Sequence, residues 1–134
     1  MSAERAIYID SSAIVKLAIA EPESASLRRY LRRRGPLVVS SALARTEVGR
    51  ALLPLGPVAV RRGIDVLARL DLIRVSDRIL ADAGTLMPAN LRSLDAIHVA
   101  TIRQLGASIS RVLTYDERMS QAVGAVGLTV VAPS

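Results

Sequence analysis

The chain contains no cysteine, tryptophan or phenylalanine, and it has only three tyrosines and one histidine. Without cysteine, neither a disulfide framework nor a cysteine-based zinc site can form. With so few aromatic rings, we do not expect a surface on which successive nucleic-acid bases stack. No apolar run reaches the roughly 20 residues of a membrane-spanning helix, and Met1–Arg5 lacks the pattern of a signal peptide. We therefore expect a soluble, cytoplasmic protein without a membrane partner.

Acidic residues are in the minority. The formal net charge is +6, because 18 basic residues, all but Lys16 arginines, stand against 12 acidic ones. Positive charge favours polyanions such as nucleic acid, and the scarcity of aromatic residues predicts contacts mainly to phosphates. The densest basic segment is Arg28–Arg34, on a predicted helix. It has two interpretations, which the sequence leaves open: a solvated helix face, or a strip that contacts phosphate or a partner protein.

The 134 residues, 51% of them hydrophobic, predict one domain, 1–134, with a substantial core. Short apolar runs predict strands at 6–9, 37–40, 72–75, 111–114 and 128–131. Helical patterns occupy 12–19, 23–34, 42–53, 57–70, a short segment that Asp77 caps, 93–105 and 116–126. This alternation predicts an α/β fold: a three-layer α/β/α sandwich around a mainly parallel sheet of four to five strands.

Four acidic residues stand where this topology would bring them together. Asp10 follows the first strand and Asp116 follows the fourth, so parallel strands would place both at one edge of the sheet. Asp95 lies in the first turn of a helix, and Glu47 interrupts the apolar stripe of another. Each also has a structural interpretation. Asp10 and Asp116 would cap helices, Asp95 would complement a helix dipole, and Glu47 would pair with Arg50.

Four carboxylates at one edge would repel one another unless a cation joined them. Oxygen ligands, with no cysteine and one histidine, suit Mg²⁺, with Mn²⁺ as a substitute, rather than zinc. Such a site can hydrolyse phosphodiester bonds with a metal-activated water. The candidate catalytic and metal-binding residues are therefore Asp10, Glu47, Asp95 and Asp116.

Three other polar residues belong to this hypothesis. The hydroxyls of Thr114 and Ser12 could hold a metal-bound water. Their alternatives are an ordinary strand threonine and a helix cap. His98, the only histidine, could be a general base or a ligand. We favour a hydrogen-bonded structural residue, because a metal-hydroxide mechanism does not require it.

Four segments in order resemble the successive motifs of PIN-domain ribonucleases, and more narrowly those of VapC toxins from bacterial toxin–antitoxin pairs. The segments are Ile7–Ala13, Ser40–Val48, Ser93–Ala100 and Leu113–Met119. The resemblance implies a PIN-like fold and a Mg²⁺-dependent endoribonuclease toxin that cleaves RNA. It matches the four acids to the acidic quartet of that family. It also implies a homodimer and a VapB-type antitoxin partner, which binds operator DNA through its other end.

Two alternative functions remain. A phosphatase that forms an aspartyl-phosphate normally has a second aspartate two residues after the nucleophile, where this chain has Ser12. A catalytically silent module would keep the fold only to bind RNA or a partner. The junction of two apolar helices, with Leu52, Leu53, Leu55 and Val58, is either packed into the core or forms a dimer or antitoxin interface.

Overall fold

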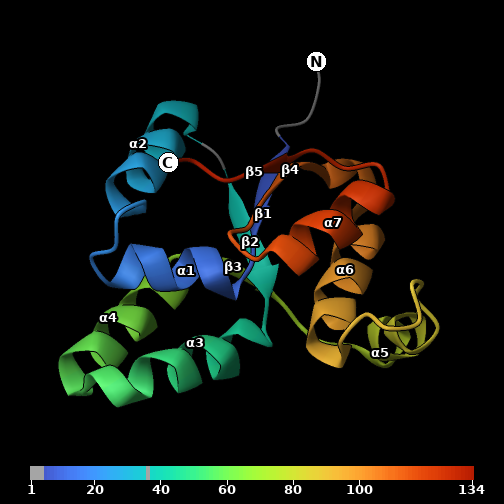
Figure 1. Ribbon diagram of the computed structural model, residues 1–134, viewed down its shortest axis with the longest axis horizontal. Coiled ribbons are helices and arrows are strands. Elements are labelled where there is room, and N and C mark those ends of the chain that lie inside the picture. Colours follow the sequence, from blue (N-terminus) through green and yellow to red (C-terminus); the bar gives the residue numbers. More distant parts are fainter. Residues whose placement is uncertain (1–4, 36) are drawn as a thin grey trace.

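A wholly parallel sheet of five strands runs through the middle of the molecule (Figure 1). The computed structural model describes residues 5–35 and 37–134, so the first four residues considered above for a signal peptide lie outside it. The strand order is β3-β2-β1-β4-β5. The strands are β1 (Ala6–Ile9), β2 (Val38–Ser41), β3 (Asp71–Ile73), β4 (Ile109–Leu113) and β5 (Val130–Val131).

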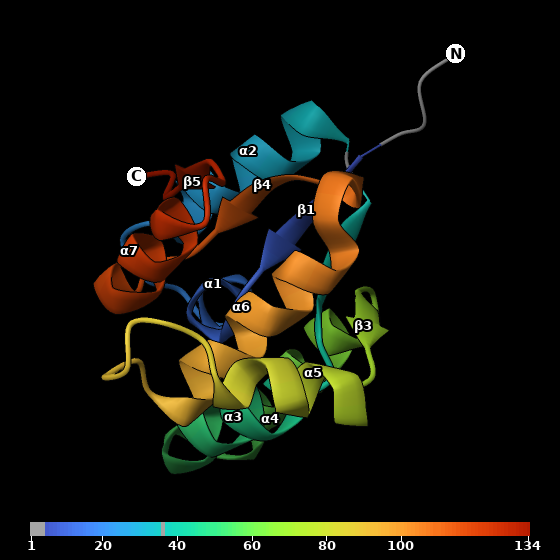
Figure 2. The same ribbon diagram turned by 90° about the vertical axis from the view of Figure 1, so that its right-hand side faces the viewer.

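Helices cover both faces of this sheet (Figure 2). The central strand β1 is buried throughout and alternates between two cores, with Ile7 and Ile9 in one and Ala6 and Tyr8 in the other. One core packs against α1 (Ser11–Ala18), α2 (Ser24–Arg34), α3 (Ala44–Leu52) and α4 (Pro57–Leu67). The other packs against α6 (Ser93–Leu105) and α7 (Glu117–Ala125), and α5 (Asp77–Gly84) lies on α6. The predicted three-layer α/β/α architecture is confirmed.

Several predicted boundaries were wrong by one to three residues. Helix α1 begins at Ser11 rather than Ser12, because Asp10 is its N-cap. Helix α5 is capped by Ser76, whose hydroxyl accepts a hydrogen bond from the backbone N–H of Ile79 at 3.2 Å, and not by Asp77. In both places a second residue that favours caps lies within two positions, and composition does not say which of them has the extended backbone that a cap needs.

The two apolar helices are shorter than predicted. Helix α3 ends at Leu52 and a 3₁₀ turn, Leu53–Leu55, leads into α4, which ends at Leu67 rather than Leu70. Within the described ranges, no helix combines the length and the apolar character needed to cross a membrane.

The helix junction divides into a buried and an exposed part. Leu52 is fully buried, as core packing predicts, whereas Leu53, Leu55 and Val58 are 56%, 57% and 67% exposed. Ile64, six residues after Val58 on α4, is 59% exposed. We call these four exposed residues, Leu53, Leu55, Val58 and Ile64, the apolar face. Because these side chains are exposed, they contribute little to the core. Of the two interpretations of the junction, core packing therefore applies to Leu52, and a dimer or antitoxin interface stays a prediction for the apolar face.

Helices α3 and α4 approach closely at Gly63. A Cβ atom added there would lie 2.5 Å from Cδ1 of Leu52 and 3.2 Å from Cγ1 of Val48. We expect Gly63→Ala to lower the free energy of unfolding by about 1–2 kcal/mol, because overpacking outweighs the gain in helix propensity. Gly49→Ala on α3 is the matched control, since its added Cβ meets nothing within 4 Å. Urea unfolding should show that Gly49→Ala is neutral or stabilising; equal effects of the two variants would contradict the close approach.

Candidate active site at the carboxyl edge of the sheet

Asp10 and Thr114 leave the sheet side by side. Strands β1 and β4 are parallel neighbours, and Ile9, the last residue of β1, pairs with Leu113, the last residue of β4. The hydroxyl of Thr114 donates a hydrogen bond of 2.5 Å to Oδ2 of Asp10, and both residues are buried. Thr114 is therefore more than an ordinary strand threonine, because it fixes the orientation of a buried carboxylate.

The other oxygen of Asp10 accepts two further hydrogen bonds. The Ser12 hydroxyl donates to Oδ1 at 2.6 Å, and the backbone N–H of Ala13 donates at 3.2 Å, which makes Asp10 the cap of α1. Ser12 is not the predicted cap; its oxygen also accepts the backbone N–H of Tyr115 at 2.9 Å and so joins the two strand ends. Burial raises the pKa of the Asp10 carboxyl above its usual value, and the hydrogen bonds from Ser12 and Thr114 offset only part of this rise.

Arg92 connects Asp95 with Asp116. Its Nε lies 3.3 Å from Oδ2 of Asp95, and its Nη2 lies 3.6 Å from Oδ2 of Asp116. Asp116 is also the N-cap of α7 and accepts the backbone N–H of Arg118 at 2.9 Å, as its structural interpretation predicts. Sequence reasoning missed Arg92. Its position three residues before Asp95, at the start of α6, was the available signal.

Glu47 pairs with His98 and not with Arg50. The side chains of Glu47 and His98 meet at 2.6 Å between Oε1 and Nε2, and Ser11 donates to the same oxygen at 2.6 Å. Because a carboxylate oxygen only accepts, Nε2 donates, and Nδ1 of a neutral ring then accepts from the Tyr8 hydroxyl at 2.6 Å. Burial raises the pKa of Glu47, but the hydrogen bonds from His98 and Ser11 bring it below its usual value.

The buried position of His98 agrees with the structural role that we favoured. It is 2% exposed and joins β1, through Tyr8, to α3, through Glu47. Sequence separation explains why this link could not be predicted, since 90 residues separate His98 from Tyr8 and 51 separate it from Glu47.

The four predicted acids thus belong to one edge of the sheet, where hydrogen bonds connect each acid with residues next to another. Ser11, the partner of Glu47, follows Asp10 directly, and Thr114, the partner of Asp10, accepts the backbone N–H of Asp116 at 3.0 Å. Across residues 5–35 and 37–134, however, no three acidic or histidine side chains are grouped closely enough to hold a metal ion. The oxygen-only donors suit a hard divalent cation in chemical type, but they are not drawn around one point.

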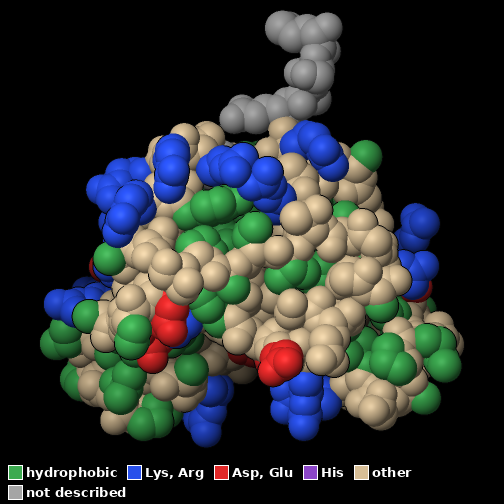
Figure 3. All heavy atoms as spheres, turned by 45° about the horizontal axis from the view of Figure 1, so that its top comes forward, with side chains coloured by type: hydrophobic (Ala, Val, Ile, Leu, Met, Phe, Trp, Pro, Cys, Tyr) green, Lys and Arg blue, Asp and Glu red, His purple; other side chains and the backbone are tan. Residues whose placement is uncertain are grey.

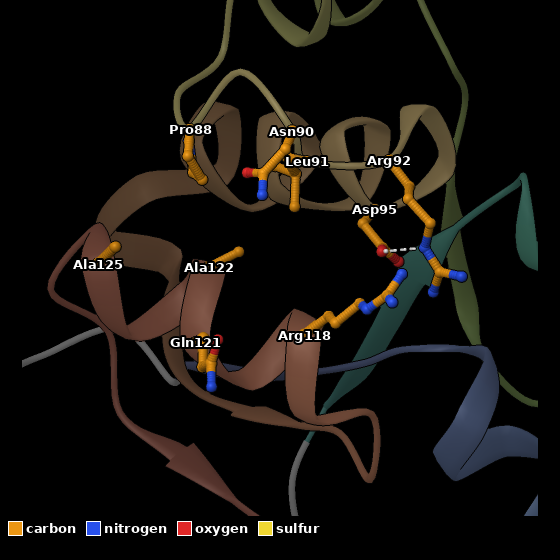
Figure 4. A pocket seen from close by; sticks show the side chains of 9 residues that line it. All are labelled: Pro88, Asn90, Leu91, Arg92, Asp95, Arg118, Gln121, Ala122 and Ala125. Carbon is orange, nitrogen blue, oxygen red and sulfur yellow. Dashed lines mark hydrogen bonds and ion pairs between the residues drawn. The ribbon is translucent and has the colours of Figure 1, made fainter.

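Asp95 also borders a pocket of about 410 Å³ between the α5–α6 loop and α7 (Figure 4). Arg92 and Arg118 line the same end of the pocket, and the side chain of Arg118 points toward Asp95. The acidic edge therefore adjoins a cavity that two arginines line, and their positive charge favours a polyanionic ligand.

The arginines of the Arg28–Arg34 segment are exposed, in keeping with a solvated face. Figure 3 shows several Lys and Arg side chains along the upper border of that view, and others at its sides and lower edge. Helix α2 ends at Arg34 just before β2 begins at Val38, so its last turn lies toward the amino ends of the parallel strands. The acids lie at the carboxyl ends. The end of the segment and the acids are thus at opposite edges of the sheet.

Comparison with known proteins agrees with this architecture. The PIN domain family model matches residues 7–124. The chain is 59% identical to Ribonuclease VapC46 of Mycobacterium tuberculosis over 129 residues, which is 96% of this chain and 98% of the relative. Among solved structures it resembles VapC20 of M. tuberculosis, a sarcin-ricin loop cleaving toxin, with a TM-score of 0.75, 20% identity and coverage of 96% and 100% of the two chains. It also resembles a chain of a toxin–antitoxin complex from Klebsiella pneumoniae, with a TM-score of 0.71, 18% identity and coverage of 96% and 98%. The chain belongs to the PIN domain family and, within it, to the VapC ribonucleases.

Proposed function

We propose that the chain is a Mg²⁺-dependent endoribonuclease and the toxin of a toxin–antitoxin pair. The observation that carries this proposal is the buried carboxylate of Asp10, held by Ser12 and Thr114 at the sheet edge where Asp116 also lies. The likeness to Ribonuclease VapC46 supports RNA as the substrate. When bound, a divalent cation would supply an activated water and stabilise the leaving oxygen of the phosphodiester.

In this proposal each polar side chain has one task. Asp10 and Asp95 are the principal metal ligands, and Glu47 and Asp116 complete the acidic set. The hydroxyls of Ser12 and Thr114 orient the Asp10 carboxylate, so that less rotamer freedom is lost when the cation binds. His98 does the same for Glu47 by donating from Nε2.

Metal removal tests the proposal directly. We expect RNA cleavage in Mg²⁺ to fall to background in EDTA and to return when Mg²⁺ or Mn²⁺ is added in excess, because the donors are all oxygens. The measurement is gel analysis of an RNA pool over time. Cleavage that continues in EDTA would refute the metal mechanism. Tight RNA binding without turnover in both metals would instead indicate the catalytically silent module.

We also propose a VapB-type antitoxin, bound to operator DNA, as a partner, a homodimer as the resting state, and the cytoplasm as the site of action. The structural neighbour in the Klebsiella pneumoniae complex supports an antitoxin, and the apolar face offers surface for one of these contacts. Sedimentation of the chain alone and with the product of a neighbouring short gene tests both partners. A chain that sediments as a monomer and does not bind that product would contradict both the homodimer and the antitoxin partner.

A further inference from the structure

The pocket beside Asp95 has the size and the lining of a ligand site. Its volume of about 410 Å³ lies within the range of small-molecule sites. One wall is apolar, with Leu91 from the loop and Ala122 from α7. Beside the Asp95 carboxylate, the polar lining consists of two amides and two guanidinium groups, which belong to Asn90, Gln121, Arg92 and Arg118. A flat apolar body with polar edges and a negative charge at one end fits this lining.

Three polar side chains of the pocket are free to bind, whereas Arg92 is paired with Asp95 and Asp116. Asn90, Gln121 and Arg118 are exposed, and within the described residues their side chains make no hydrogen bond or ion pair. Figure 4 shows the Asn90 amide projecting into the pocket, where it offers both a donor and an acceptor. Exposed amides need no internal partner, but an amide at this place can bond to the edge of a ligand beside the acids.

We propose that this pocket binds one unpaired RNA nucleotide next to the scissile phosphate, and that Asn90 reads its base. This inference rests on the nuclease function proposed above. Unpaired bases are recognised by flat contacts and by hydrogen bonds to their edges, and guanidinium planes can replace aromatic rings as the flat surface. The base lies against Leu91 and Ala122, and its phosphate lies at Arg92 and Arg118, beside Asp95.

The inference assigns a role in specificity rather than in chemistry. Asn90 and Gln121 are not among the acids or their hydrogen-bond partners, so removing either amide leaves the metal-binding groups intact. An amide that pairs with a base edge changes the choice of cut site, whereas a phosphate contact or a structural role changes the rate at all sites alike.

The test is the cut-site profile on a randomised single-stranded RNA pool, read by sequencing the fragment ends. We expect the parent to prefer one base at one position next to the cut, and Asn90→Ala to reduce that preference about tenfold. Asn90→Asp should move the preference toward cytosine, because a carboxylate accepts from its amino group. Gln104→Ala, which removes an exposed amide on α6 outside the pocket, should leave the profile unchanged.

The outcomes separate the two proposals. If the parent cleaves RNA in Mg²⁺ and Asn90→Ala leaves the base preference unchanged, the base-reading role is wrong and the nuclease function stands. A uniform loss of rate without a change in preference also refutes it. If the parent cleaves no RNA, the nuclease function fails and the pocket assignment fails with it.

Discussion

Asp10→Asn should lower the rate of RNA cleavage in Mg²⁺ by at least about 10³-fold, since the loss of several kcal/mol of metal-dependent stabilisation corresponds to that factor. Asp95→Asn should have an effect of similar size. The amide keeps the shape of Asp10 but loses the negative charge that a hard cation needs. The fold should survive, because asparagine caps a helix as well as aspartate does. Initial rates on one RNA, together with thermal unfolding, measure both effects.

The matched control is Asp65→Asn, which removes an exposed carboxylate on α4, away from the acidic edge. It should cleave RNA at the parental rate. In cells, expression of the parent should arrest growth and expression of Asp10→Asn should not. If both Asp10→Asn and Asp95→Asn cleave RNA at the parental rate, the assignment of Asp10 and Asp95 as metal ligands is wrong.

His98→Ala should be the most destabilising change at the site. It removes the histidine partner of the buried Tyr8 hydroxyl and one of the two partners of the half-buried Glu47 carboxylate, which keeps the hydrogen bond from Ser11. An unpaired buried hydroxyl costs about 1–3 kcal/mol, and the lost hydrogen bond to Glu47 and the cavity add to it, so we expect the free energy of unfolding to fall by about 3–5 kcal/mol. Urea unfolding followed by circular dichroism measures this loss.

Tyr8→Phe is the smaller member of the same series. It removes one hydrogen bond of His98 and leaves the bond to Glu47, so its cost should be about 1–2 kcal/mol. The two changes share a partner, and the double variant should therefore be less destabilised than the sum of the two. A His98→Ala variant as stable as the parent would show that the link between β1 and α3 has no energetic role.

The layers of this fold were predictable because the chain repeats a simple pattern. Continuous apolar runs such as Ala6–Ile9 indicate strands buried on both faces, and helical patterns between them require parallel neighbours. The helix ends were less predictable, since Asp10 and Ser12, or Ser76 and Asp77, compete for one cap. That choice depends on the backbone of a single residue, which the surrounding tertiary structure determines.

The candidate site was predictable only in part, for a similar reason. Asp10 and Asp116 follow paired strands, so topology alone brings them to one edge. Glu47 is paired with His98 on α6, which is 51 residues away along the sequence, and Arg92 pairs with two acids from the end of a loop. These contacts depend on how helices and loops pack, and the periodicity of a sequence does not contain that information.

The central claim is that separate strands and helices bring acids together to bind a hard cation. Anomalous scattering from a crystal soaked in Mn²⁺ tests it most directly. The account predicts a peak in contact with the carboxylates of both Asp10 and Asp95, and its loss in Asp10→Asn. A fully occupied Mn²⁺ peak remote from both carboxylates, or none at a concentration that supports RNA cleavage, would contradict it.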